Sequence, residues 1–133
     1  MKFTRLNTIR TNNLQDPEIQ TKIMELWKES EKSIQDAGTQ GKVIACVYHE
    51  YESNYTGDYS VSIAIEDKLK GEFDTAVFEW KVYPVDPSDD LGIVNTWKKI
   101  WAQEEQQLIN RVYAFDFESY TNGEIAINVA VKK

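Results

Sequence analysis

Long apolar runs are missing from this chain of 133 residues, and so are most of the residues that build disulfides and metal sites. No apolar stretch reaches the roughly 18 residues that a membrane-spanning helix needs, so we expect no membrane span. The single cysteine, Cys46, excludes an internal disulfide. The single histidine, His49, has no second histidine or cysteine at ligand spacing. We therefore expect neither a metal site nor a cofactor.

Basic residues are also in deficit, since 15 Lys and Arg stand against 22 Asp and Glu, for a formal net charge of −7. Binding to a phosphate backbone depends on clustered Lys and Arg, and no basic stripe or helix-turn-helix is present. We predict no direct nucleic-acid binding, so any control of transcription would need a separately encoded regulator. The start, Met1 to Arg5, leads into alternating residues rather than a signal peptide, so we expect a cytoplasmic protein.

What the chain does contain is an internal repeat. At an offset of 66 residues the aligned positions include Glu52 with Glu118, Gly57 with Gly123, and the segment 59–65 with 125–131. Further upstream the offset grows to 74, and Trp27 aligns with Trp101. We predict a single domain, 1–133, whose repeats 1–66 and 73–133 pack about a pseudo-twofold axis. A central cleft would then lie at the seam between the two halves.

Local patterns assign the same element order, βαββ, to both repeats. In the first, strands are predicted over 3–11, 43–52 and 59–66, with one helix from Asp16-Pro17 to Ala37. In the second, strands are predicted over 75–85, 111–120 and 124–132, with a helix from the caps at 88–90 to Leu108. The prediction is an α+β fold, an antiparallel sheet with two helices on one face. The bulky strand face should pack on the helices. The small-residue face is either solvated or kept clear for something to approach.

Several motifs follow one another in an order known from one family. They are Arg10 to Asn13, Val47 to Glu52, Tyr55 to Tyr59, Val94 to Trp101 and Asp116 to Tyr120. In this order the chain resembles the GyrI-like effector-binding domain, in particular the stand-alone branch that includes integron-associated effector-binding proteins. The segment 71–74 departs from the proline-glycine approach of many members, and we expect no DNA-binding domain of the kind that many regulators of the family carry.

The resemblance implies a cleft with aromatic walls, where a buried glutamate attracts lipophilic, cationic small molecules. Glu118 matches the family's acid in the late strand. Independently of the family, Glu118 lies among aromatic residues in a strand expected near the sheet centre, where an unpaired carboxylate is costly. A cation about 4 Å away would gain roughly 4 kcal/mol at an effective dielectric constant near 20. The alternative is that Glu118 pairs with a lysine or caps a turn.

Other candidate ligand-binding residues surround this acid in the prediction. They are Glu52, Trp97, Trp101, Tyr48, Tyr51, Tyr113 and Tyr120. Glu52 is either a second acid of the site or a surface residue near a turn. Trp97 and Trp101 lie one helical turn apart, so they either pack in the core or line the cleft. Tyrosines suit a pocket that is apolar but needs polar tips.

Three functions remain open at this stage. We favour binding of a lipophilic cation by an effector-sensing or drug-sequestering protein. Some members of the family resemble hydrolases that open strained cyclopropane rings, in which case Glu52 and Glu118 would act as base and stabiliser. Another branch suggests a protein-interaction module that inhibits a partner such as a topoisomerase. No nucleophile–base pair or phosphate loop is evident, so we expect a binding protein rather than an enzyme.

Overall fold

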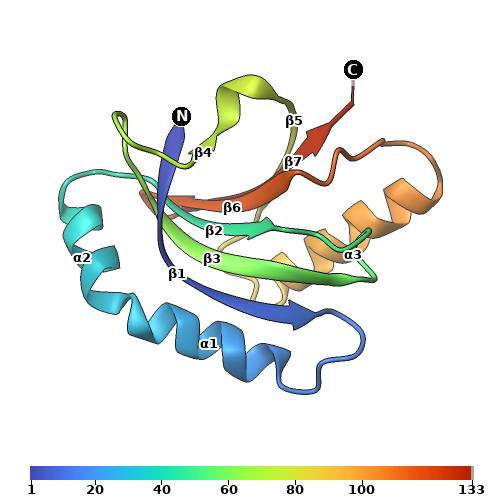
Figure 1. The fold of residues 1–133 in the computed structure, drawn as a ribbon, viewed down its shortest axis with the longest axis horizontal. Helices are drawn as coiled ribbons and strands as arrows, with labels where there is room; N and C mark the ends of the chain where they lie inside the picture. Colours follow the sequence, from blue (N-terminus) through green and yellow to red (C-terminus); the bar gives the residue numbers. More distant parts are fainter. Residues whose placement is uncertain (133) are drawn as a thin grey trace.

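A computed structural model describes residues 1–132, which form one curled antiparallel sheet with helices packed against it (Figure 1). The strands of this part of the chain are β1 (Lys2–Asn12), β2 (Ile44–His49), β3 (Asp58–Glu66), β4 (Phe73–Asp74), β5 (Glu79–Val85), β6 (Phe115–Thr121) and β7 (Glu124–Val131). They make a seven-stranded half-barrel in the order β4-β1-β3-β2-β6-β7-β5. The α+β fold with an antiparallel sheet is confirmed.

Residues 1–132 contain three α-helices, α1 (Ile19–Glu29), α2 (Glu31–Thr39) and α3 (Gly92–Glu105), and one short 3₁₀ turn, η1 (Thr75–Val77). The prediction of two helices is wrong because the first is broken at Ser30. This residue is buried, and its Oγ donates a hydrogen bond of 2.8 Å to Asn7 Oδ1 on β1. A serine side chain that bonds elsewhere competes with helix continuation, although the apolar spacing runs on across it. None of the helices in the described range is long and apolar enough to cross a membrane.

Two predicted strands end in different places from those expected. The strand 43–52 stops at His49, because Glu50 adopts a positive φ of 51° and turns the chain away, which leaves Glu52 in a bend. The strand 111–120 begins only at Phe115, and Tyr113, with φ of 61°, lies in the loop before it. The strand predicted from 75 begins at Glu79 because η1 precedes it.

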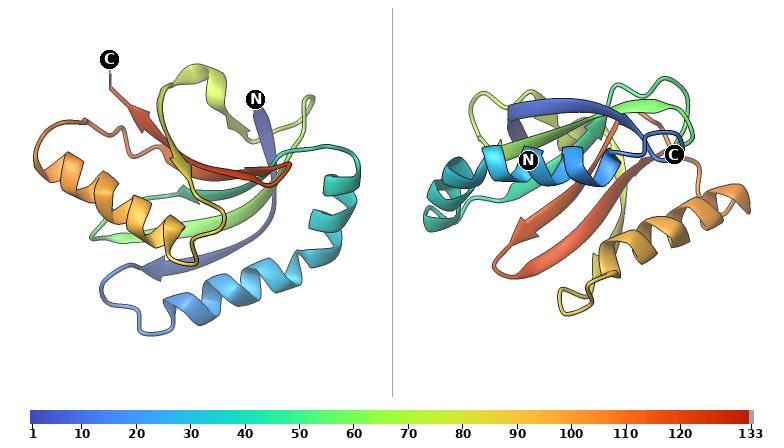
Figure 2. Two further views of the ribbon diagram at one scale, coloured as in Figure 1. Left: turned by 180° about the vertical axis from the view of Figure 1, so that it is seen from behind. Right: turned by 90° about the horizontal axis from the view of Figure 1, so that it is seen from below.

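The bulky face of the sheet packs on the helices, as predicted. Leu26 of α1 is 1% exposed and packs in a cluster with Cys46, Tyr59, Val61 and Ile63 of β2 and β3. Ile100 of α3 packs in a cluster with Ile127 and Val129 of β7. Seen from below (Figure 2), α1 and α3 both lie in front of the sheet, and β6 and β7 run between them. The helix-facing side of β6 therefore lies between two helices.

The opposite, small-residue face is covered rather than open. Ser62, Ala64 and Ala130 are fully buried. A layer of aromatic residues packs in the core on this side: Phe3, Phe115 and Phe117, with the half-buried Phe73, Phe78 and Trp80 around them. The sequence predicted that this face would be either solvated or kept clear for a ligand. Both alternatives are wrong, because aromatic side chains bury it. The helix-facing side is thus where a site should be sought.

His49 lies in this covered layer and has a pKa lowered by burial. Its Nε2 is hydrogen-bonded to Ser62 Oγ at 2.7 Å, and its ring meets the ring of Phe73 edge-on. The charged groups that act on it are Glu50, Arg5, Glu72 and Arg10. Because the folded protein holds His49 neutral while the unfolded chain protonates it near pH 6.5, acid favours unfolding.

We expect the free energy of unfolding to fall as the pH drops below about 6.5, by at most about 1.4 kcal/mol per pH unit from this group. Above that pH both states carry a neutral imidazole, and the contribution is constant. Urea unfolding between pH 7 and pH 5 measures the slope. His49→Gln, whose amide can still reach Ser62, should flatten it, since His49 is the only histidine in the chain. An unchanged slope in that variant would assign the pH dependence to other groups.

Candidate functional site

Glu118 lies in the middle of β6 on the helix-facing side, with 3% of its surface exposed. Three aromatic side chains donate hydrogen bonds to its carboxylate. Tyr48 Oη and Trp97 Nε1 both reach Oε2, at 2.6 and 2.9 Å, and Tyr120 Oη reaches Oε1 at 2.5 Å. These donors come from β2, α3 and β6, so the fold brings together residues that are far apart in the sequence. We call Glu118 with Tyr48, Trp97 and Tyr120 the Glu118 cage.

The cage holds an acid without a basic partner, since no lysine or arginine among residues 1–132 forms a salt bridge with Glu118. Burial, with charge repulsion from neighbouring groups that include Glu118, raises the pKa of Tyr48 and of Tyr120 well above the usual value. Both phenols are therefore neutral donors at neutral pH. A hydrogen bond to a charged group contributes about 1.5–3 kcal/mol, so the three bonds offset part of the penalty for burying the carboxylate. The alternative of a lysine partner is therefore not found in the part of the chain that the structure describes.

Further rings extend the cage toward solvent. Trp27 of α1 meets the Tyr120 ring edge-on at a centroid separation of 5.1 Å, and Tyr48 meets Trp97 at 5.2 Å. The rings of Tyr48, Trp97 and Tyr120 are only half-buried, whereas the carboxylate they bond is buried. A cation that approaches this side would therefore meet aromatic rings before the acid, an arrangement that suits cation–π contact.

A second buried acid lies two residues before Glu118 on the same strand face, and this one is paired. Asp116 Oδ2 accepts from Arg111 Nη2 at 2.7 Å, and the two side chains are 0% and 1% exposed. The other oxygen, Oδ1, accepts from the backbone N–H of Ala130 at 2.9 Å. Sequence reasoning missed this pair. The spacing of Asp116 and Glu118 was the available signal, because alternate residues of a strand share a face.

Two predicted ligand-binding tyrosines belong to this pair rather than to Glu118. Tyr51 Oη donates to Asp116 Oδ2 at 2.5 Å, and the Arg111 guanidinium lies 4.3 Å from the Tyr113 ring centroid. Arg111 also lies 5.6 Å from the centroid of the Trp97 ring. We call Arg111, Asp116, Tyr51 and Tyr113 the Arg111 box. Trp97 joins the two groups, because one side chain contacts both Arg111 and Glu118.

The remaining two predicted residues lie outside the cage. Trp101 stacks on Tyr55 at a centroid separation of 5.1 Å and on Trp97 at 6.4 Å, so it continues the aromatic row along α3. Glu52 is exposed in the bend after β2, where its backbone N–H donates to the carbonyl of Asp58. The structure thus brings Tyr48, Trp97 and Tyr120 to Glu118, and leaves Glu52 apart. Within residues 1–132, no three Asp, Glu, His or Cys side chains are placed to hold a metal ion.

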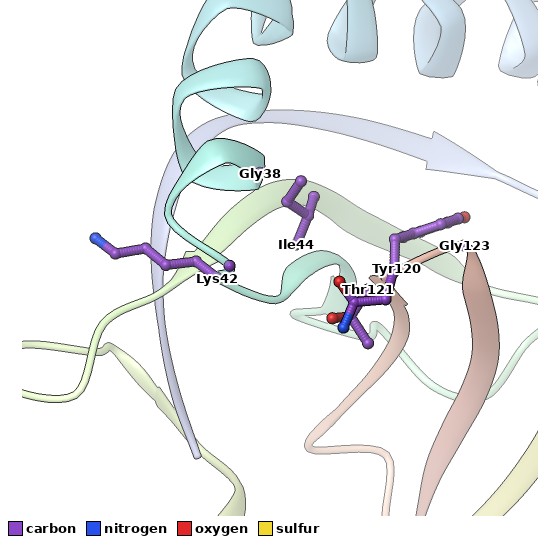
Figure 3. A pocket seen from close by; sticks show the side chains of 8 residues that line it. Gly38, Lys42, Ile44, Tyr120, Thr121 and Gly123 are labelled. Carbon is purple, nitrogen blue, oxygen red and sulfur yellow. The ribbon is translucent and has the colours of Figure 1, made fainter.

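Two cavities lie beside the cage. One of about 210 Å³ lies between the C-terminal end of α2 and the β6–β7 hairpin, and Tyr120 forms part of its wall (Figure 3). The other, of about 410 Å³, is a shallow hollow on α1 and α2, lined by Trp27, Lys28, Glu31, Ile34 and Gln35. Glu118 lines neither of them. In this conformation the aromatic donors close over the carboxylate, so a ligand that reaches it must first displace one of them.

Comparison with known proteins finds likeness at the level of fold. Neither a scan against protein-family models nor a search of curated proteins gives a match. Among solved structures, an integron cassette protein from the mobile metagenome of Vibrio cholerae aligns with a TM-score of 0.69 and 18% sequence identity. The alignment covers 98% of this chain and 94% of that one. Over nearly its whole length, therefore, this chain shares the curled α+β fold of that integron cassette protein.

Proposed function

We propose that this chain binds lipophilic cations, with Glu118 as the anchor. The observation that carries the proposal is the Glu118 cage, in which a buried carboxylate has three aromatic donors and no salt bridge to any lysine or arginine of the described residues. In the ligand-free protein, the hydrogen bonds from these donors supply part of the stabilisation that a bound cation would give to the carboxylate. A cation about 4 Å from the carboxylate would gain roughly 4 kcal/mol at an effective dielectric constant near 20, and contact with a ring adds about 0.5–2 kcal/mol.

The charges around the cage favour a cation over an anion. Arg111 does not cancel Glu118, because its guanidinium is already engaged by Asp116 at 2.7 Å and lies 3.5 Å from Glu104. The cluster therefore holds more acid than base. The formal net charge of −7 adds a weak long-range attraction for cations, which salt would screen.

We also infer that the chain is built from two βαββ units and belongs with the GyrI-like effector-binding domains. The strand order supports this reading, since β1-β3-β2 on one side of the sheet is followed by β6-β7-β5 on the other. In this arrangement the halves meet where β2 pairs with β6, and Glu118 lies opposite Cys46 in that pairing. The cage would then lie at the seam between the units. Such a protein would sense an effector for a separately encoded regulator, or sequester a drug in the cytoplasm.

Binding is better supported than hydrolysis with two glutamates. The proposed hydrolytic pair requires Glu52 close to Glu118, and Glu52 is exposed in a bend outside the cage. The acid that does lie near Glu118 is Asp116, which is engaged by Arg111, Tyr51 and Ala130. A carboxylate that is ion-paired with a buried arginine is poorly placed to act as a base.

Titration of the intrinsic tryptophan fluorescence with two dyes of opposite charge tests the proposal. Rhodamine 6G, a lipophilic cation, should give saturable quenching because Trp97 lies in the cage, whereas the anionic dye fluorescein should not. Trp97→Phe should reduce the amplitude of the quenching. Glu52→Gln tests whether that exposed acid contributes, and we expect its affinity to equal that of the wild type. Saturable quenching of equal strength by both dyes, or by neither, would contradict a cation site.

A further inference from the structure

The cavity of about 210 Å³ adjoins the cage through a single side chain. Its lining residues are Gly38, Gly41, Lys42, Ile44, Tyr120, Thr121, Asn122 and Gly123. Ile44 and Tyr120 are cross-strand partners in the β2–β6 pairing, and both lie on the helix-facing side. In Figure 3 the Lys42 side chain points away from Tyr120, so its charge is directed out of the cavity. The wall nearest the cage is therefore Ile44 and Tyr120.

Glu118 lies directly behind that wall. The next pair on the same strand face is Cys46 with Glu118, about 7 Å further along the strands. The Tyr120 side chain spans this interval, because its Oη donates to Glu118 Oε1 at 2.5 Å, and Tyr120 is also one of the residues that line the cavity. Tyr120 thus connects the cavity to an acid that has no basic partner among residues 1–132.

We propose that this cavity is the entrance to Glu118, that Tyr120 is its gate, and that the site takes protonated amines carrying one aromatic ring. The inference rests on the proposed function and specifies its ligand class. When the Tyr120 side chain turns away, Oε1 loses the only donor that the structure gives it. A ligand that replaces this donor must bring an N–H of its own, because an acceptor left unpaired in a buried site is costly.

Size and chemistry together narrow the ligand class. Sites for drug-sized molecules typically enclose about 300–1,000 Å³, so a cavity of about 210 Å³ accepts one ring rather than a fused ring system. A larger dye would place only one substituted ring of its ring system in the cavity and leave the remainder outside it. A quaternary ammonium ion carries the charge but has no N–H, and it would leave Oε1 unsatisfied. The gate therefore discriminates between two kinds of cation with the same charge.

A matched pair of small cations tests this inference by isothermal titration calorimetry at pH 7. N,N-Dimethylbenzylamine is protonated and has one N–H, and benzyltrimethylammonium has a methyl group in its place. We expect the protonated amine to bind about tenfold more tightly to the wild type, the ratio typical of one charge-assisted hydrogen bond. Tyr120→Phe keeps the ring and removes the competing hydroxyl, so the amine should bind this variant more tightly than the wild type. A wall residue without a gating role would leave that affinity unchanged or weaken it.

Gly38 lines the cavity at the end of α2 and tolerates a larger side chain without strain. A Cβ added at Gly38 would meet no atom within 4 Å, and this residue has no positive φ, unlike Gly41 and Gly123 at 70° and 79°. Gly38→Leu should occupy the cavity and weaken binding of the amine by about tenfold or more, an amount comparable to the loss of one good apolar contact. Gly38→Ala is the control, since it stabilises α2 but leaves most of the space free, and its affinity should match that of the wild type.

The outcomes separate this inference from the function on which it rests. If rhodamine 6G binds the wild type but neither small cation does, the inference is wrong while the proposed function stands, and if rhodamine 6G does not bind either, both are wrong. If the amine binds and Glu118→Gln abolishes the binding, the proposed function stands. In that case, equal affinity for the two cations together with an unchanged affinity in Gly38→Leu would overturn the entrance and its gate.

Discussion

Arg111→Met is expected to lower the free energy of unfolding by about 3–5 kcal/mol, the range found when one partner of a buried ion pair is removed. The Asp116 side chain is 0% exposed, and without Arg111 it keeps only the Tyr51 hydroxyl and the Ala130 N–H as partners. These neutral donors do not replace the guanidinium. Methionine preserves much of the side-chain volume, so the loss would report the charge rather than a cavity. Urea unfolding followed by tryptophan fluorescence measures it.

The double variant Arg111→Met with Asp116→Asn is the control for this result. It removes both charges, while the asparagine oxygen can still accept from Ala130 and its NH₂ can donate to the Tyr51 hydroxyl, which then turns to accept. Replacing a whole buried pair by neutral groups is often close to neutral for stability, so most of the lost free energy should return. If Arg111→Met stays within about 1 kcal/mol of the wild type, the Arg111 box does not stabilise the fold in the way described.

Unlike Arg111→Met, Glu118→Gln should keep the free energy of unfolding of the wild type but lose the binding of cations. The glutamine oxygen can accept from Tyr48 and Trp97 as Oε2 does, and its NH₂ can donate to the Tyr120 hydroxyl, which then turns to accept. No charge remains buried, so the free energy of unfolding should equal or exceed that of the wild type to within about 1 kcal/mol. The affinity for a lipophilic cation should fall by about 100-fold or more, since the lost attraction is roughly 4 kcal/mol before solvent compensates part of it.

Equilibrium dialysis with rhodamine 6G measures the affinity of Glu118→Gln, and urea unfolding of the same preparation measures its free energy of unfolding. Glu124→Gln is the matched control, because it makes the same change in net charge at an exposed position at the start of β7. Its affinity and stability should both remain at the wild-type values. Should Glu118→Gln lose several kcal/mol of stability as Arg111→Met is expected to, Glu118 would be a structural acid like Asp116.

Two acids on one strand face would then have separate roles. Asp116 is fully buried and paired with a buried arginine, and this pairing indicates a structural role. Glu118, two residues later, has aromatic donors and no lysine or arginine partner within the described range 1–132. A protein that holds an uncompensated charge in this way gives up stability, which is typical of sites where the charge is needed for binding.

Much of the sheet and the centre of the cage follow from alternation along the strands. The pattern of β6 places Glu118 and Tyr120 on one face, and the apolar content of β2 predicts a buried strand that carries Tyr48. Trp97 and Trp101 lie one turn apart on α3, and an aromatic helix face of this kind is expected to pack on the sheet. Strand register then brings these side chains together, and the sequence does not contain that register explicitly. The cage was therefore predictable as a set of candidate residues, although its hydrogen bonds were not.

The parts that could not be predicted depend on contacts across long stretches of chain or on single backbone angles. Arg111 lies in the loop before β6 and not in the predicted strand 111–120, where alternation would have placed it on the face opposite Asp116. The positive φ of Glu50 ended β2 early and removed Glu52 from the strand that the repeat alignment assigned to it. Ser30 broke the first helix through a bond to Asn7, a partner that only the folded chain supplies.

The most direct test of the central claim is the stabilisation that a bound cation gives to the folded state. Urea unfolding of the wild type at a rhodamine 6G concentration about 100 times the dissociation constant should show a gain of about 2.7 kcal/mol over the ligand-free protein. Glu118→Gln at the same dye concentration should show almost none. Equal gains in the two proteins would mean that the cation binds elsewhere, and would contradict Glu118 as its anchor.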